Sequence, residues 1–242
     1  MSILKDAINL ILPGSCIVCK RLGLSHDELP FNMPDNLNLC ANCLSKLVPI
    51  DEDRRWLPCL SEPFKGDLYP GLPLYVPFTY DDFFDKAIPI MKFKPNQSLA
   101  VFLGRMLGSV MVQDGITVDC VVPIPLSAQR LKERGFNQAG VIGRECAQIL
   151  GVLFCDDVLV RLKNTKRQTS LSGVSDRSSN VADAFRVVSS GVRGKVVMLV
   201  DDVATTGSTL HEAAVELYKG GASKVLCVAL CGNRSIKNAE PF

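Results

Sequence analysis

The sequence has no long apolar run, no Walker loop and few histidines. No apolar stretch reaches the about 18 residues of a membrane span, so no such span is expected. Because no Gly-Lys-Ser/Thr sequence occurs, a P-loop NTPase is excluded. The two histidines, His26 and His211, belong to no visible catalytic constellation, and His211 is expected on a helix surface. With 47% apolar and 21% charged residues, the composition is typical of a folded globular chain rather than a disordered one.

The chain's length and charge indicate a compact protein with an anionic ligand. Its 242 residues suffice for one α/β domain and a small additional module. The net charge is only +2, but residues 121–195 contain twelve Lys and Arg against six Asp and Glu. This local positive excess suits pyrophosphate, a nucleotide or a nucleic acid.

Ten cysteines are present, and their distribution favours metal binding in a reducing cytosol over disulfides. Cys120, Cys227 and Cys231 lie in apolar runs and are expected to be small core residues. Residues 1–12 have an apolar helical face but neither a basic start nor a small-residue cleavage site. We therefore interpret them as a packing helix rather than a signal peptide, and expect a cytoplasmic protein.

Two C-x-x-C pairs predict a metal centre near the N-terminus. Cys16 and Cys19 form the first pair, and Cys40 and Cys43 form the second. Two pairs of thiolates can complete the tetrahedral shell of a structural zinc ion. Zn²⁺ is the favoured occupant, and an iron–sulfur cluster is the alternative. Cys59 is left over and is interpreted as an unliganded thiol.

Alternating strands and helices predict parallel β-α-β units. Apolar spacing predicts helices at 98–113, 137–150 and 208–219, and strands at 74–80, 118–124, 196–200 and 224–230. The Pro- and Gly-rich stretch 49–77 is expected to be an irregular linker, and the polar, basic stretch 158–180 a loop.

Residues 197–209, VMLVDDVATTGST, carry the strongest functional signal. A buried strand ends in Asp201 and Asp202, and a Thr/Gly/Ser turn then opens a helix at about Ser208. Ligands of a parallel sheet bind at this edge. The turn leaves backbone N–H groups free for a phosphate, and the carboxylates can accept sugar hydroxyls or join a magnesium shell. The candidate phosphate-binding residues are Val203, Ala204, Thr205, Thr206, Gly207, Ser208 and Thr209.

A second motif, PIPL followed by SAQRLKERGFNQ, leads from the strand at 118–124 into a basic stretch. Arg130 and Arg134 are four residues apart and share a face if the stretch is helical. Their guanidinium forks suit a bidentate grip on phosphate, with a solvated basic face as the alternative. Lys92 and Lys94, ahead of the helix at 98–113, are further candidates for holding pyrophosphate.

Residues 197–209 resemble the signature of type I phosphoribosyltransferases, which bind 5-phosphoribosyl 1-pyrophosphate (PRPP). Taken with the cysteine pairs and the P-I-P-L…R-x-x-x-R-G-F-N-Q pattern, nearly the whole chain resembles the ComF family (ComFC/GntX type). Further marks are Met91-Lys92-Phe93-Lys94, Gln168 after a basic run, and R-x-x-N-V-x-x-A-F at 177–185. Many members have more C-x-x-C pairs where this chain has only Cys59, so one metal ion is expected.

The resemblance implies a type I phosphoribosyltransferase-like parallel sheet flanked by helices, with a small N-terminal zinc-binding module. We divide the chain into residues 1–60 (helix and zinc-ribbon-like module), 61–80 (linker and first strand) and 81–242 (phosphoribosyltransferase-like domain). In that fold family the acidic pair, here Asp201 and Asp202, contacts the ribose hydroxyls, and the turn wraps the 5′-phosphate. Mg²⁺ accompanies PRPP.

The resemblance also implies a role in DNA uptake for natural transformation, with a competence helicase and other DNA-processing proteins as partners. Two activities stay open. The first is a PRPP-dependent transferase, with Asp201 and Asp202 as candidate catalytic residues, basic side chains on the departing pyrophosphate and residues 163–180 as a lid. The second is a nucleotide or single-stranded DNA-binding module without turnover. Phe136 and Phe185 are the obvious aromatics among the basic positions, which argues against strong single-strand binding.

Overall fold

The computed structural model of the chain describes residues 14–22, 33–34, 37–57, 72–93, 97–162 and 184–232. Several predictions fall outside these residues: the helix at 1–12, His26, Cys59, Lys94, Gln168 and the lid at 163–180. Within the described parts, no helix combines the length and the apolar character needed to cross a bilayer.

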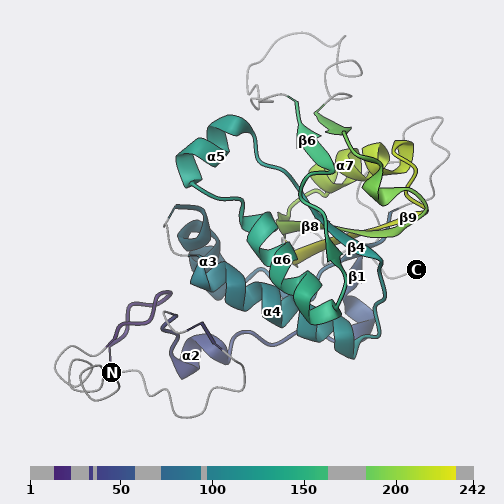
Figure 1. The fold of residues 1–242 in the computed structure, drawn as a ribbon. Coiled ribbons are helices and arrows are strands. Elements are labelled where there is room, and N and C mark those ends of the chain that lie inside the picture. Colours follow the sequence, from purple (N-terminus) through teal and green to yellow (C-terminus); the bar gives the residue numbers. More distant parts are fainter. Residues whose placement is uncertain are drawn as a thin grey trace, which may run out of the picture.

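A mostly parallel sheet lies at the centre of the fold (Figure 1). Its strands run in the order β1 (Trp56–Leu57), β2 (Leu74–Tyr75), β9 (Lys224–Gly232), β8 (Val196–Ala204), β4 (Cys120–Pro123) and β5 (Leu153–Phe154), and β3 (Phe78–Thr79) also pairs with β9. Only the pairing of β1 with β2 is antiparallel among these described strands. The predicted α/β class is confirmed.

Strand β8 extends further than its apolar pattern predicted. The prediction ended it at Val200, but it continues to Ala204 and includes both aspartates. Strand β4 ends opposite Val200, whereas β9 pairs with β8 as far as Ala204. The acidic pair therefore lies where β8 loses its neighbour on one side and keeps it on the other.

The predicted strand at 74–80 is instead two short strands, β2 and β3. Between them, the Val76 N–H donates to the carbonyl of Arg55, and Pro77 has no N–H to offer to the sheet. Both strands pair with β9, so the chain returns to the same neighbour after this interruption.

Three helices follow the apolar spacing closely: α4 (Ser98–Gln113), α6 (Gln138–Leu150) and α7 (Ser208–Lys219). The short helix α5 (Ala128–Arg134) precedes α6. Helix α3 (Asp82–Phe93) was not predicted, although its buried residues have helical spacing. Asp81 caps it by accepting the N–H groups of Phe83 and Phe84 at 3.0 and 3.2 Å.

The prediction of a loop at residues 158–180 is wrong at its start. Residues there form β6 (Leu159–Arg161), which pairs antiparallel with β7 (Phe185–Val187) in a separate two-stranded sheet. Two 3₁₀ turns, η1 (Glu52–Arg54) and η2 (Ser190–Val192), and the single-turn helix α2 (Ala41–Leu44) complete the described elements.

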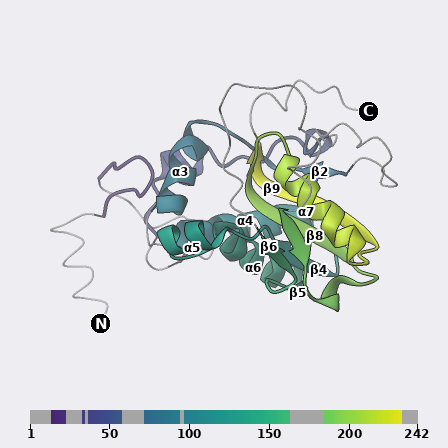
Figure 2. The same ribbon diagram turned by 90° about the horizontal axis from the view of Figure 1, so that it is seen from above.

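Helices cover both faces of the sheet (Figure 2). Along β8, Met198 and Val200 pack in one apolar cluster with α3, α4 and α6. Val197 and Leu199 face a second cluster with α7, β6 and β7. Close contact between α4 and α6 depends on Gly104, where a Cβ would lie 2.7 Å from the carbonyl oxygen of Ile142.

The described N-terminal residues share the cluster of α3 and α4. Cys16, Leu39 and Cys43 are buried in it, and α2 lies beside these helices in Figure 1. Farther along, Arg55 pairs with Asp114 at the end of α4. The chain up to β1 is thereby attached to the helical layer, while the boundary at residue 60 stays a prediction.

Candidate functional site

Asp201 and Asp202 lie next to each other at the end of β8 but have different surroundings. Asp202 is 8% exposed, and its Oδ2 is 2.9 Å from Nζ of Lys92 on α3. Among the described residues, that oxygen has an ion-pair partner but no hydrogen bond of acceptable angle. Asp201 is partly exposed, and its Oδ1 accepts the N–H of Asp202 at 2.8 Å. The edge of the sheet thus holds two carboxylates and one ammonium group.

The crowding of these carboxylates is energetically costly. Burial raises the pKa of Asp201 to about 8, the Asp202 carboxylate adds to the rise, and the Asp202 N–H and the Lys92 ammonium oppose it. Burial of Asp201 beside a second carboxylate therefore disfavours its ionised form. Hydroxyl donors or a cation supplied by a ligand would relieve this cost, and shifts of this kind cluster at functional sites.

The turn after β8 leads directly into a helix N-terminus. Val203 and Ala204 belong to β8, and Gly207 (φ 74°) is the N-cap of α7 without a side-chain capping bond. Thr206 and Ser208 are exposed, with their hydroxyl oxygens 2.8 Å apart. Because the first N–H groups of a helix have no intrahelical acceptor and carry the positive dipole end, this turn can receive an anion.

The helix expected to present Arg130 and Arg134 is α5. The Ser127 hydroxyl caps it by accepting the N–H of Arg130, and Gly135 ends it at φ 79°. Burial lowers the pKa of Arg134, and the nearby Asp202 carboxylate opposes this. Arg134 remains charged and lies within electrostatic reach of the acidic pair, whereas Arg130 is exposed.

A buried glutamine connects Arg134 to the helix that carries Lys92. Gln138 is 2% exposed, and its Oε1 accepts from Nη1 of Arg134 at 2.9 Å. Its Nε2 donates to the carbonyl oxygen of Met91 at 3.2 Å. Gln138 therefore links Arg134 at the end of α5 to the backbone of α3 beside Lys92, the residue that contacts Asp202.

Sequence reasoning missed Arg161 on β6. Its guanidinium carbon lies 5.1 Å from the ring centroid of Phe185. Burial lowers the pKa of Arg161, Arg130 lowers it further, and Glu212 and Asp201 oppose the change. Arg161 thus adds positive charge from a second element beside Arg130, but it lies in a stretch whose composition resembled a loop.

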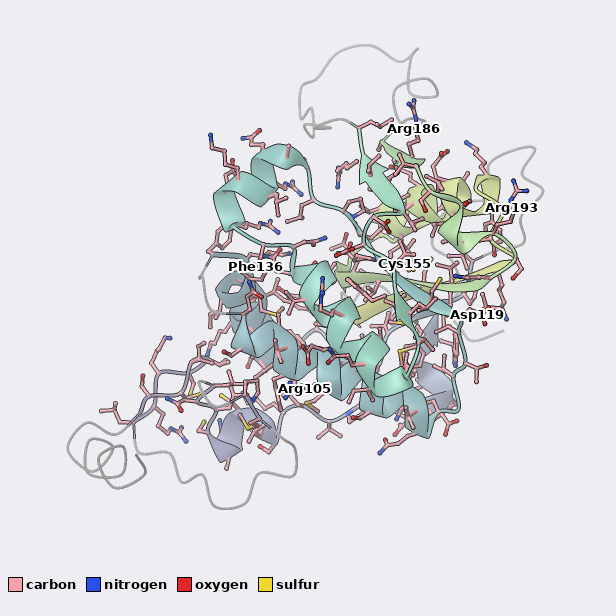
Figure 3. All side chains as sticks on the ribbon, in the orientation of Figure 1. Arg105, Asp119, Phe136, Cys155, Arg186 and Arg193 are labelled. Atoms are coloured by element: carbon pink, nitrogen blue, oxygen red, sulfur yellow. The ribbon has the colours of Figure 1, made fainter. Side chains whose placement is uncertain are left out.

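The two aromatics singled out from the sequence are buried. Phe136, labelled between α5 and α6 in Figure 3, is 8% exposed, and Phe185 is 3% exposed. Neither ring is open to a base in this structure.

The four predicted metal ligands do come together. The sulfur atoms of Cys16, Cys19, Cys40 and Cys43 all lie within 4.8 Å of one another, and those of Cys19 and Cys40 are 3.5 Å apart. A tetrahedral Zn–S₄ site requires sulfurs about 3.8 Å apart, so the donor set and its spacing fit such an ion. A backbone hydrogen bond from Arg21 lowers the pKa of Cys19 to about 7, whereas burial raises the pKa of Cys40 and of Cys43. This cluster can hold a metal ion.

The comparisons with known proteins concern both the site and the whole chain. Residues 137–240 match the phosphoribosyl transferase domain family. The chain is 32% identical to the DNA utilization protein YhgH of Escherichia coli O157:H7 over 236 residues, covering 90% of each chain. It is 31% identical to competence protein ComFC of Bacillus subtilis over 152 residues, covering 61% of this chain and 59% of that one.

A solved structure of the glutamine PRPP amidotransferase from Bacillus subtilis is also similar. It is 21% identical and covers 59% of this chain and 30% of that one, at a TM-score of 0.42. This likeness is too distant to carry an argument about function.

The match to the phosphoribosyl transferase domain family at residues 137–240 contains β8, the acidic pair and α7.

Proposed function

Because the chain belongs to the ComF family of DNA utilization and competence proteins, we propose that it binds PRPP at the end of β8 and serves the uptake or use of DNA. The observation that carries the proposal is the acidic pair, followed directly by an exposed turn at the N-terminus of α7. This arrangement offers acceptors for sugar hydroxyls and donors for a phosphate within one continuous segment.

Each part of PRPP has a matching group at this site. In the proposal, Asp201 and Asp202 accept the ribose hydroxyls, and residues 205–209 surround the 5′-phosphate. Lys92 contacts Asp202, Arg134 interacts electrostatically with both aspartates, and the two cations can neutralise pyrophosphate. Mg²⁺ bound with PRPP would supply further positive charge to the pyrophosphate. Transferase turnover would use the same contacts, because pyrophosphate gains negative charge as it leaves.

A second candidate is phosphate recognition in nucleotides or single-stranded DNA without turnover. It is favoured by the positive charge of Arg134 and Arg161, each of which interacts electrostatically with Arg130 and with Asp201. Phosphate oxygens of PRPP and of a DNA strand present the same acceptors to a guanidinium group. The two activities can therefore share this surface.

The cysteine cluster has a structural role in this proposal. Zn²⁺ would close the four thiolates into one site and stabilise a segment that has little core of its own. The protein would act in the cytosol, where thiolates stay reduced, with a competence helicase and DNA-processing proteins as partners. The three-part division at residues 60 and 80 belongs to the same proposal.

Calorimetric titration with PRPP, with and without Mg²⁺, tests the central assignment. The double variant Asp201→Asn/Asp202→Asn should lose affinity by about a hundredfold or more, because each lost hydrogen bond to a charged group costs about 1.5–3 kcal/mol. Arg144→Ala is a matched surface control, since Arg144 pairs with exposed Asp156 on another part of the molecule. Unchanged PRPP affinity in the double variant would overturn the site.

A further inference from the structure

One exposed aromatic side chain directly follows Lys92, the residue that contacts the acidic pair. Phe93, the last residue of α3, is 77% exposed, and the guanidinium carbon of Arg134 lies 5.9 Å from its ring centroid. Two other arginine–phenylalanine pairs occur in the described chain, and in both the ring is more enclosed. Phe154 under Arg144 is partly buried, and Phe185 under Arg161 is 3% exposed.

The exposure of Phe93 follows from the positions of its neighbours on α3. Met91 is fully buried in the core, and Lys92 is directed to Asp202. Since successive helical residues are rotated by about 100°, a ring that follows these two side chains is turned away from the core. The ring is therefore presented to solvent one residue from the contact between Lys92 and the acidic pair.

One side chain, Gln138, connects Arg134 to the backbone of α3 close to Phe93. Gln138 accepts a hydrogen bond from Arg134 and donates one to the carbonyl oxygen of Met91, two residues before Phe93. Gln138 is itself buried, so its two hydrogen bonds fix the distance between the end of α3 and the end of α5. At 5.9 Å, Arg134 is at the outer limit of a cation–π contact and leaves much of the ring uncovered.

We propose that Phe93 and Arg134 form a nucleobase subsite, in which the base stacks on the Phe93 ring and an adjoining phosphate pairs with Arg134. Every base has a π-face, so the subsite accepts any base, and the guanidinium supplies the charge for the phosphate. The inference deepens the proposed function, because it names the ligand class that reaches the edge of the acidic pair. A nucleotide and a single strand of DNA carry this same chemistry.

Variants at residue 93 separate stacking from bulk and from charge. The probes are oligo-dT and an abasic deoxyribose-phosphate oligomer of matched length. Phe93→Leu, which keeps an apolar side chain without a ring, should weaken oligo-dT binding by roughly 5- to 140-fold, the effect of one base–aromatic stack. Phe93→Tyr should bind as the unchanged chain does. Arg144→Ala, which removes the arginine of an equivalent pair elsewhere, should also have no effect.

Fluorescence gives an independent measurement. The chain has a single tryptophan, Trp56, so Phe93→Trp in a Trp56→Phe background places one reporter at the proposed subsite. Oligo-dT should quench this reporter, and the abasic oligomer should leave it unchanged. Thermal unfolding of each variant shows that the fold is intact.

The outcomes show whether the base comes from a single nucleotide or from a DNA strand. They also separate failure of the nucleobase subsite from failure of the PRPP site. If dTMP and oligo-dT both lose affinity in Phe93→Leu, the subsite serves a single nucleotide; if only oligo-dT does, it serves a strand. Equal oligo-dT affinity in Phe93→Leu and the unchanged chain, or equal binding of the abasic oligomer, would overturn the subsite. Failure of the unchanged chain to bind PRPP would overturn the proposed PRPP site and leave this measurement standing.

Discussion

The Asp201 carboxylate should lower the free energy of unfolding while it supports ligand binding. Both effects can be measured in the single variant Asp201→Asn. Asp201→Asn keeps the side-chain oxygen that accepts the Asp202 N–H at 2.8 Å, but it removes the ionisable group. Because burial and Asp202 raise the pKa of Asp201 to about 8, the folded chain binds its proton more tightly than the unfolded chain. Stability must therefore fall as the pH rises from about 4, where unfolded Asp titrates, toward 8.

Asp201→Asn has no carboxyl group at this position to ionise, so its stability should not fall with pH for this reason. Asp201→Asn should unfold at the same denaturant concentration as the unchanged chain near pH 4, and its advantage should grow with pH. At pH 8 we expect an advantage on the order of 2–4 kcal/mol, after allowance for coupling with Asp202 and partial exposure. Urea unfolding followed by circular dichroism at several pH values measures it.

Asp119 offers the matched control. It lies at the far end of the sheet from α5 (Figure 3), and its Oδ2 accepts the N–H of Val196 at 2.7 Å. Asp119→Asn makes the same chemical change at the opposite end of β8 and reports the effect of losing one negative charge and one carboxylate acceptor of a backbone N–H. An Asp201→Asn chain that is less stable than the unchanged chain at pH 8, or whose difference does not vary with pH, would refute the reasoning.

The remaining predictions concern the groups around the acidic pair and the cysteine cluster. Lys92→Met leaves buried Asp202 without its cation and should lower the unfolding free energy by about 2–3 kcal/mol at neutral pH. Adding Asp202→Asn to this variant should recover most of the lost free energy. Equal stability of Lys92→Met and the unchanged chain would contradict the ion pair. Elemental analysis should find one zinc ion per chain, lost in Cys40→Ser and kept in Cys59→Ser, whereas two ions would reveal a missed site. Arg130→Ala/Arg134→Ala should weaken the binding of both PRPP and single-stranded DNA, and the log–log salt slope of DNA binding should become less steep by about 0.7 per phosphate contact removed. DNA binding that persists in this variant and in saturating PRPP would separate the two sites.

The regular helices could be predicted because their signal is local. Helices α4 and α7 begin and end where the apolar spacing placed them. The cysteine cluster was also accessible, since two C-x-x-C pairs have few ways to arrange four sulfurs. In each case, nearby residues in the sequence contain the whole pattern.

Other features depend on contacts between distant segments. Asp201 and Asp202 interrupt the apolar pattern of β8, yet pairing with β9 continues the strand past them. Helix α3 contains Pro89, a residue that usually interrupts a helix, so the sequence of this segment does not indicate a helix. The link from Lys92 to Asp202 joins residues in distant parts of the sequence, and no periodicity or spacing in the sequence encodes it.

Hydrogen-exchange mass spectrometry with PRPP and Mg²⁺ tests the central claim most directly. PRPP should slow exchange of the backbone amides in residues 203–210, where the turn and the first turn of α7 would enclose the 5′-phosphate. Peptides from residues 37–47, in the cysteine module, should exchange at the same rate with and without the ligand. Protection confined to the cysteine module, or absent from 203–210 at saturating PRPP, would contradict the assignment of this edge of β8 as the PRPP site.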